Sequence, residues 1–237
     1  MTRQPRGIRA ENRERIETEI LRLGREQLAS VGPAGLSVRA VARDLGMASS
    51  AVYRYVASRD ELLTRLIVES YDALGDAAQE AHDAVDAADL RGRWFAVGRA
   101  VRAWGIAHPH DWALLYGSPV PGYAAPTDRT TDPGTRVTDL LAGLLRDAVS
   151  TGREAPEDRR PPASPALLAL ASHLLGALGP GEEDVSPALF ATGIVAWTLV
   201  VGSVSSEVFE QLGELGPSAY AVLHDHALAL GAHALLR

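Results

Sequence analysis

The 237-residue chain has no cysteine and no lysine. The lack of cysteine excludes disulfides, thiolate catalysis and Cys-based zinc sites. All 23 basic residues are therefore arginines, and together with the high content of Ala and Gly they suggest a bacterial genome rich in GC. Aromatic residues make up only 5% of the chain, and four of them are Trp.

The motifs of common catalytic and metal sites are also missing. No His-Glu-x-x-His, Gly-x-Ser-x-Gly, phosphate-binding loop or Gly-x-Gly-x-x-Gly pattern occurs. His224 and His226 are two residues apart, and side chains at that spacing diverge on a helix. We therefore expect a protein that is not an enzyme and that holds neither a metal nor another cofactor.

A long run without charge spans Val185 to Ser206 and has the length of a membrane helix. However, it contains several hydroxyl side chains, the acidic stretch 182–184 precedes it, and no arginine cluster flanks it. A helix buried in a helical body or at a subunit interface accounts for it better.

The basic N-terminus lacks the apolar core of a signal peptide. We expect a cytoplasmic protein with no membrane partner.

The most informative segment, Val38 to Val56, predicts two short helices joined by a tight turn. Apolar or small residues keep helical spacing on both sides of Gly46, where the turn needs a residue that tolerates positive φ. Ala42 lies where a larger side chain would hold the helices apart. This spacing is typical of a helix-turn-helix, whose second helix enters the major groove of DNA.

A purely structural helical hairpin can also show Gly at its turn, and on this segment alone that alternative stays open. The residues after Gly46 favour DNA binding because they are small or polar enough to approach base edges and phosphates closely. The candidates for base contact are Ser49, Ser50 and Arg54, and those for phosphate contact are Ser37, Arg39, Tyr53, Tyr55 and Arg59. Ala48 is a further candidate for DNA contact.

The flanks of this segment carry helix signals of their own. Ser58 and Glu61 have the spacing of a capping box, so a helix is expected to start at about Arg59. Upstream, Gly32 ends an amphipathic helix, and Ser37 is a plausible N-cap of the next one. The result is a three-helix head followed by a long connector helix that ends near residue 83.

The run from Ile16 to Leu63 resembles the DNA-binding domain of the TetR family of transcriptional regulators. The matching residues are Gly32, Leu36-Ser37-Val38, Val41-Ala42, Leu45-Gly46, Ala51-Val52-Tyr53, Tyr55-Val56 and Ser58 to Leu63. There are two departures: Tyr53-Arg54-Tyr55-Val56 replaces the frequent Tyr-Xaa-His-Phe, and Arg59 replaces a frequent Lys. Both changes keep an apolar closure and a cation near a phosphate.

Charge divides the chain unevenly. Residues 1–65 carry twelve Arg against eight acidic residues, a net charge of +4, whereas residues 66–237 carry eleven Arg against twenty-two acidic residues, a net charge of −11. A basic head on an acidic body is typical of a protein that presents one end to nucleic acid. We divide the chain into a flexible basic arm (1–12), a helix-turn-helix DNA-binding domain (13–60) and a helical effector-binding and dimerisation domain (61–237).

Two interpretations of the arm stay open. In the first, it binds DNA by tracking the backbone or entering the minor groove, as homeodomain arms do. In the second, it is an ordinary disordered terminus.

For the rest of the chain the predicted fold class is all-α: a three-helix head, a connector helix and a larger helical body. Helices are expected at 59–83, 89–107, 110–117, 134–150, 165–178, 186–211 and 217–235. Breaks are expected at 117–134, 152–165 and 179–187, with a mobile surface loop at 151–162.

Trp104 to Tyr123 resembles one type of TetR-like C-terminal domain, in which an Ala-His-Pro segment leads to a Tyr and then to Gly, Pro and Val. Trp197, Gly202 and Glu207 also fit that type. Where it often has a His before the Gly, this chain has Val201, so a ligand contact by that His cannot be carried over.

The resemblance implies that the body encloses an effector pocket and that its last two long helices, at about 186–211 and 217–235, pack against a second subunit. Small-molecule pockets combine large apolar surfaces with a few polar groups. For each residue taken alone, a role in the core or at a helix end is the stronger alternative. The candidates for effector contact are Trp94, Arg102, Trp104, His110, Trp112, Tyr116, His173 and Trp197.

Together these observations predict a ligand-responsive transcriptional regulator. We expect a homodimeric repressor that binds a palindromic operator in double-stranded DNA and leaves it when a small-molecule effector binds. The alternative is an all-helical ligand-binding protein without DNA binding, against which the positive head argues. A small-molecule enzyme on a helical body is a third class, but nothing in the sequence points to a catalytic nucleophile or base.

Overall fold

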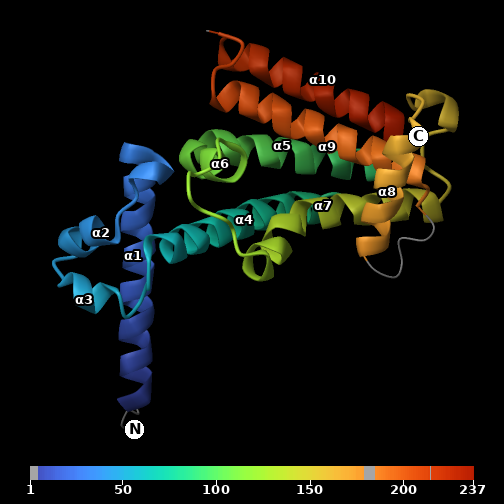
Figure 1. Cartoon of the computed structure of the whole chain (residues 1–237). Coiled ribbons are helices and arrows are strands. Elements are labelled where there is room, and N and C mark those ends of the chain that lie inside the picture. The colour runs from blue at the N-terminus through green and yellow to red at the C-terminus, as the bar shows by residue number, and fades with distance from the viewer. Residues whose placement is uncertain (1–4, 179–184, 214) are drawn as a thin grey trace. The chain divides into compact units, whose positions relative to one another are not determined.

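The computed structural model describes residues 5–178, 185–213 and 215–237, and within these ranges it contains helices and no strand (Figure 1). This confirms the predicted all-α class. The elements are α1 (Pro5–Gly35), α2 (Val38–Asp44), α3 (Ser49–Val52), α4 (Arg59–Asp83), α5 (Leu90–Ala107), α6 (Pro109–Tyr116), α7 (Thr127–Ser150), the 3₁₀ helix η1 (Glu157–Arg159), α8 (Pro165–Leu178), α9 (Pro187–Val208) and α10 (Pro217–Leu235).

The helices form two compact units. We call residues up to Tyr71 together with Pro109–Gly134 the head, and Asp72–His108 together with Thr135–Arg237 the body. The head is therefore larger than the predicted domain at 13–60, because the first half of α4 and the segment from α6 to the start of α7 belong to it. Two helices, α4 and α7, contribute residues to both units.

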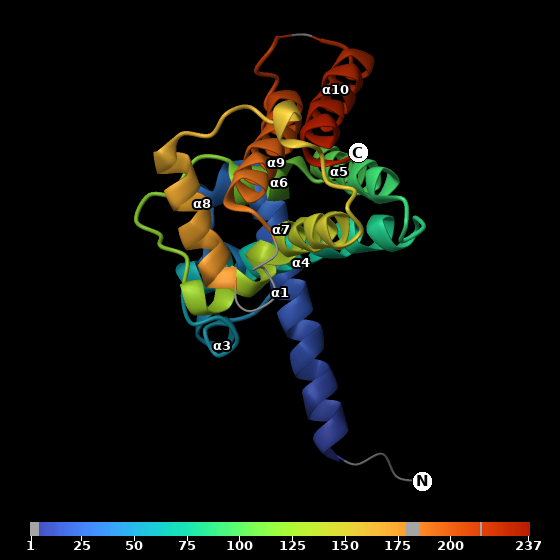
Figure 2. The same ribbon diagram turned by 90° about the vertical axis from the view of Figure 1, so that its right-hand side faces the viewer.

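In the head, α1 is interrupted near its end. Gly32 has φ +69° and ψ 174°, so the chain kinks there and continues as a short helical turn to Gly35. At its other end α1 begins at Pro5, so residues 5–12, which we expected to form a flexible arm, are helical. Figures 1 and 2 show α1 extending past α2 and α3 on its amino-terminal side. Residues 1–4 of the expected arm lie outside the described residues.

The core of the head is built from helices that lie far apart in the sequence. Ile20 of α1, Val41 of α2, Val52 of α3 and Leu63 of α4 are all fully buried. Several side chains from α6 and the loop that follows pack against this cluster: Leu114, Leu115, Val120 and Tyr123. Burying one such aliphatic side chain is worth about 1.5–3 kcal/mol, so this shared core holds the head together.

In the body, α9 packs against α5, α8 and α10, and α10 also packs against α5 (Figure 2). Two glycines bring these helices close together. A Cβ atom at Gly98 would lie 2.2 Å from Cδ2 of Leu228, and one at Gly231 would lie 2.6 Å from Cζ2 of Trp94. Glycine at both positions therefore permits a spacing that any side chain would widen.

The structure differs from the predictions in the start of α7 and in the loop at 151–162. Helix α7 begins at Thr127 rather than near 134, so the last part of the break expected at 117–134, with Pro133, is helical. The expected mobile loop at 151–162 is held to the C-terminus: the Ala155 amide donates to the Leu235 carbonyl at 2.9 Å, and the Arg237 amide to the Arg153 carbonyl at 2.8 Å. Most of the predicted break at 179–187 lies outside the described residues.

Helix α9 covers most of the uncharged run seen in the sequence. Among the described residues it is the one helix long and apolar enough to cross a membrane by length and composition. It nevertheless packs against three other helices of the body. Its composition is therefore that of a bundle helix, and the membrane interpretation gains no support from the fold.

Candidate nucleic-acid interface and effector crevice

The predicted helix-turn-helix is present, with a short second helix. Helix α2 ends at Asp44, Gly46 adopts φ +68°, and α3 runs from Ser49 to Val52. The turn is closed by backbone hydrogen bonds from the Gly46 amide to the Arg43 carbonyl (3.0 Å) and from the Met47 amide to the Ala42 carbonyl (2.9 Å). With no Cβ at residue 46, this left-handed conformation costs little.

Five of the nine predicted DNA contacts are exposed on the helix-turn-helix. They lie on α2, in the turn, and along and just after α3: Arg39, Ala48, Ser50, Tyr53 and Arg54. Ser49 is half-buried. Because Val52 and Val56 on the same segment are fully buried in the head core, the exposed residues are presented on a well-packed support, as base and phosphate recognition requires.

Two other predicted contacts already have partners. The Ser37 hydroxyl accepts a hydrogen bond from the Ala40 amide at 3.4 Å, and this caps α2 as expected from the sequence. Tyr55 is half-buried, and the guanidinium carbon of Arg13 lies 5.3 Å from its ring centroid. A cation above an aromatic ring is attracted to it, so Arg13 links α1 to the residues that follow α3.

The surroundings of Arg59 differ from those expected of a side chain that is free to contact a phosphate. Its guanidinium donates to the Pro33 carbonyl at 2.9 Å and to the Ala34 carbonyl at 3.4 Å, and it lies 3.4 Å from the Asp60 carboxylate. The two carbonyls belong to the short turn that follows the Gly32 kink. Arg59 therefore ties the start of α4 to the end of α1, a role that sequence spacing could not reveal.

The capping box at the start of α4 is half formed. The Ser58 hydroxyl accepts from the Glu61 amide at 3.0 Å, as predicted. The Glu61 carboxylate instead pairs with Arg65 at 2.7 Å and with Arg129 at 2.5 Å. The hydrogen bond from Arg129 is the largest cause that lowers the pKa of Glu61 below its usual range, and Arg65 adds to it.

Asp111, on α6, is a polar contact of the head that sequence analysis missed. It accepts a hydrogen bond from the Ser70 hydroxyl of α4 at 2.6 Å and lies 3.6 Å from the Arg25 guanidinium of α1. The Tyr123 and Thr64 hydroxyls are 2.9 Å apart in the same unit. These contacts link α6 and the loop after it to the helices that carry the helix-turn-helix.

The eight predicted effector residues do not form one cluster. His110, Trp112 and Tyr116 belong to the head, where Trp112 is fully buried and burial raises the pKa of the Tyr116 hydroxyl. His110 and, in the body, His173 are exposed. The structure therefore distributes these candidates between the two units.

The remaining candidates of the body are Arg102, Trp104, Trp94 and Trp197. Arg102 forms a bidentate pair with Glu207, with both N–O distances 2.7 Å. Trp104 is buried and stacks on His108 at a centroid distance of 5.0 Å. In the body, Trp94 and Trp197 are brought to one place. In the head, the ring centroids of Trp112 and Tyr116 lie 4.5 Å apart.

These two tryptophans line an apolar crevice in the body. It has about 160 Å³ of space not filled by atoms, part of which is open to solvent, and it leaves no room for a water molecule within the protein. Its lining comes from α5, α7, α9 and α10: Trp94, Val97, Gly98, Leu141, Trp197, Val200 and Leu228. Ligand pockets usually measure about 300–1,000 Å³, so the crevice as it stands is too small to hold a ligand.

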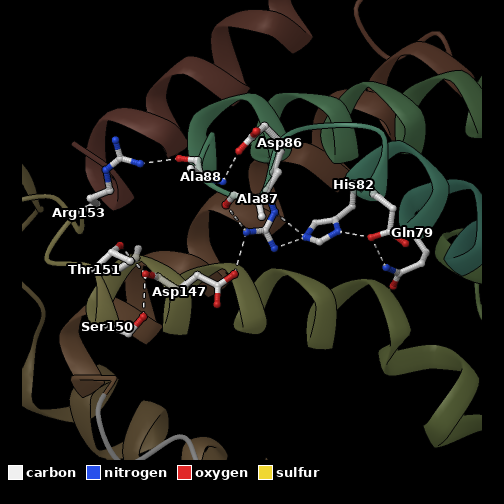
Figure 3. A network of polar contacts seen from close by, with 12 residues as sticks. Gln79, His82, Asp86, Ala87, Ala88, Asp147, Ser150, Thr151 and Arg153 are labelled. Carbon is white, nitrogen blue, oxygen red and sulfur yellow. Dashed lines mark hydrogen bonds and ion pairs between the residues drawn. The ribbon is translucent and has the colours of Figure 1, made fainter.

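A buried arginine of α5, Arg93, fixes the end of the connector helix within the body. Figure 3 labels three of the residues around it, His82, Ala87 and Asp147. Arg93 of α5 donates to the Nε2 atom of His82 on α4 at 2.8 Å, to the Ala87 carbonyl at 3.1 Å and to the Asp147 carboxylate of α7 at 2.8 Å. Because arginine only donates, His82 must accept at Nε2, which leaves its Nδ1–H to donate to Asp83 at 2.8 Å.

A buried histidine joins α10 to α5 and α9. His224 is almost fully buried; its Nε2 lies 3.0 Å from the Gly98 carbonyl and its Nδ1 2.8 Å from the Ser203 hydroxyl. The carbonyl can only accept, so Nε2 carries the proton. Burial lowers the pKa of His224 below its usual value of 6.5, because a charged imidazole loses hydration there.

Fold and site together define a class: an all-helical DNA-binding protein with an exposed helix-turn-helix on a basic head and a separate helical body. The model of bacterial regulatory proteins of the tetR family matches residues 20–66, and that of the tetracyclin repressor-like C-terminal domain matches residues 94–230. The second match alone covers more than half of the chain. The chain therefore belongs to the TetR family of transcriptional regulators.

Relatives that match most of the chain are transcriptional regulators as well. The HTH-type transcriptional regulators Rv1816 of Mycobacterium tuberculosis and Mb1846 of Mycobacterium bovis are each 45% identical over 208 residues, which cover 87% of this chain and 86% of theirs. Among solved structures, regulatory protein SCO4313 is 28% identical with a TM-score of 0.68 and coverage of 96% and 98%. The KstR2 regulator of M. tuberculosis shares the fold at 15% identity, with a TM-score of 0.53 and coverage of 93% and 95%. These names describe regulators rather than enzymes.

Proposed function

We propose that this protein is a cytoplasmic, homodimeric repressor that binds a palindromic operator and releases it when a small-molecule effector binds. The observation that carries the proposal is the helix-turn-helix itself. Ser50, Tyr53 and Arg54 are exposed at α3, whereas Val52 and Val56 beside them are fully buried. Polar residues on a fixed support are what major-groove recognition needs.

Within the interface, we assign base contact to Ala48, Ser49, Ser50 and Arg54, and phosphate contact to Arg39 and Tyr53. Arg59 and Ser37 support the head instead, because both side chains bond to its backbone. Basic residues at the amino-terminal end of α1 are candidates for further backbone contacts, since a basic helix near the duplex gains from the phosphate charge.

The dimer interface is assigned to α9 and α10. Both helices expose large apolar side chains: Val195 and Leu199 on α9 are 49% and 42% exposed, and Val222 and Leu230 on α10 are 69% and 49% exposed. Contiguous exposed apolar surface is uncommon on monomers and marks interaction sites. A second copy packed on these helices would bury it and set two heads at a fixed spacing.

The effector would act by its preference for one body shape. A ligand shifts an equilibrium only by the difference between its affinities for the two states. A coupling of about 1–3 kcal/mol, typical of allosteric proteins, changes DNA affinity by about 5- to 150-fold. The narrow crevice between Trp94 and Trp197 suits this idea because a ligand entering it has to separate packed helices.

Two experiments test the proposal. A gel shift with DNA upstream of the gene should give a salt-dependent complex, and a purely ligand-binding protein would give none. Light scattering should find a dimer, which the double variant Val222→Asp, Leu230→Asp converts to a monomer. Leu170→Asp on α8, also exposed at 51%, is the matched control and should stay dimeric. A wild-type monomer, or a control that dissociates equally, would contradict the assigned interface.

A further inference from the structure

The hydrogen bonds of the His82 imidazole require a neutral ring at the end of α4. Arg93 of α5 donates its Nε–H to the Nε2 atom of His82 at 2.8 Å, and its Nη2 nitrogen contacts the same atom. Arginine only donates, so Nε2 is the ring nitrogen without a proton. A histidinium carries a proton on both ring nitrogens and can accept from neither donor. Protonation of His82 therefore breaks both contacts with Arg93.

The charged groups around His82 determine where a protonated ring goes. From α5, the Arg93 guanidinium is only 8% exposed and repels a cation at Nε2, and such repulsion is stronger where water is excluded. From α4 itself, the Asp83 carboxylate lies 2.8 Å from Nδ1 and attracts that cation. From α7, Asp147 is already paired with Arg93 at 2.8 Å. A histidinium therefore keeps its contact within α4 and loses its contact with α5.

Two further charged side chains bond to the loop that follows α4. Asp86 accepts from the Ala88 amide at 2.8 Å, and Arg153 donates to the Ala88 carbonyl (Figure 3). Both are therefore engaged with the backbone of the loop. Arg93 also donates to the Ala87 carbonyl of this loop at 3.1 Å, and this hydrogen bond does not depend on the imidazole. Protonation thus frees the last turn of α4 and leaves the loop attached to α5.

Little apolar packing holds that last turn in place. Ala78 is the last fully buried residue of α4, and the next buried residue along the chain is Leu90 of α5. The side chains of residues 79–89 are all exposed or half-buried. The attachment of the turn to α5 therefore depends on the polar contacts between His82 and Arg93.

From these contacts we propose that His82 is a proton-sensitive attachment: the neutral ring holds the last turn of α4 against α5, and protonation releases that turn. Histidine is the side chain whose charge ordinarily changes between about pH 5 and 8. Helix α4 starts at Arg59, directly after the helix-turn-helix, so a loosely attached α4 positions the head less firmly and lowers operator affinity. This last step rests on the proposed function, whereas the release itself does not.

Hydrogen exchange on the full chain tests the release. Labelling at about pH 5.5 and about pH 7.5, with times adjusted for the intrinsic exchange rates, reports on the amides of Ala84 and Val85, which bond to the Glu80 and His82 carbonyls at 3.1 and 3.3 Å. In the wild type their protection should fall at least tenfold at the lower pH, as expected from the loss of one hydrogen bond to a charged group. Equal protection at both pH values overturns the proposal.

Two variants and a matched control assign the effect to His82. His82→Gln offers a carbonyl oxygen that accepts from Arg93 and does not titrate, so the turn should stay protected at both pH values. His82→Lys carries a permanent cation and should expose it at both. His224→Asn replaces the buried histidine between α10 and α5 and should leave the response of the turn as in the wild type. A response that persists in His82→Gln, or that disappears in His224→Asn, contradicts the assignment.

Operator affinity tests the regulatory step separately. Fluorescence anisotropy compares the wild type with His82→Gln at each pH, and the ratio of their affinities cancels the pH effects common to both. The two should bind equally at the higher pH, and the wild type at least threefold more weakly at the lower pH, because affinity falls with the fraction of molecules that hold α4 in place. A ratio that stays at one while the turn opens refutes control of DNA binding by His82. If neither protein binds the operator at any pH, the proposed function fails, and hydrogen exchange alone decides the attachment.

Discussion

The contacts of Arg59 lead to a prediction that separates support of the head from contact with DNA. Its guanidinium donates to the Pro33 carbonyl at 2.9 Å and to the Ala34 carbonyl at 3.4 Å. Hydrogen bonds to charged groups contribute about 1.5–3 kcal/mol. Because the Arg59 side chain is 31% exposed, solvent weakens this contribution, and we expect Arg59→Ala to cost about 1 kcal/mol.

The matched variant is Arg39→Ala. Arg39 is exposed on α2 and is assigned to a phosphate. Losing one phosphate contact lowers the slope of log K against log salt by about 0.9 for each half-site, with no change in stability. Arg59→Ala should instead leave the slope unchanged and lower the melting temperature by about 2–4 °C, the usual effect of 1 kcal/mol in a chain of this size.

The assay is a fluorescence-anisotropy titration of labelled operator over a series of salt concentrations, with thermal melts of each variant. Arg59→Lys adds a check, since lysine keeps the charge but not the forked donor geometry; it should behave like Arg59→Ala. If Arg59→Ala reduces the slope as Arg39→Ala does, with an unchanged melting temperature, Arg59 contacts a phosphate and our assignment of its role is wrong.

Three further predictions concern stability. The pKa of His224 is lowered by burial, so the unfolded chain binds more protons below pH 6.5 and stability should fall as the pH decreases there; His224→Asn should flatten this dependence in denaturant titrations, and an unchanged dependence would contradict the role of His224. Gly46→Ala should cost about 1–2 kcal/mol because of its positive φ, whereas Gly7→Ala in helical backbone should not destabilise. Leu63→Ala should cost about 2–5 kcal/mol by leaving a cavity, which urea melts would detect; a loss below 1 kcal/mol would contradict the packing described.

Local signals predicted the helix-turn-helix well. The turn at Gly46, the N-cap at Ser37 and the start of α4 after Ser58 depend on neighbouring residues, and the structure has all three. The expected helix at 59–83 coincides with α4. The start of α7 was predicted too late: Pro133, a residue that usually ends or kinks a helix, lies six residues inside it.

Contacts between distant segments were not predictable. Nothing near Asp111 or Tyr123 in the sequence indicates that they bond to Ser70 and Thr64 of the head. Likewise, a tryptophan that lines a crevice and one that fills a core have the same local pattern. For that reason the sequence could nominate Trp94 and Trp197 but could not separate them from Trp112.

The central claim is that two helix-turn-helix heads read one palindrome. Footprinting of the purified protein on DNA upstream of its gene tests it most directly. We predict two protected half-sites related by two-fold symmetry, centred about 34–36 Å apart or a multiple of that, and an Arg54→Ala variant that relaxes the preference for one base pair in each half. Protection of a single asymmetric site, or no protection at any salt concentration, would contradict the claim.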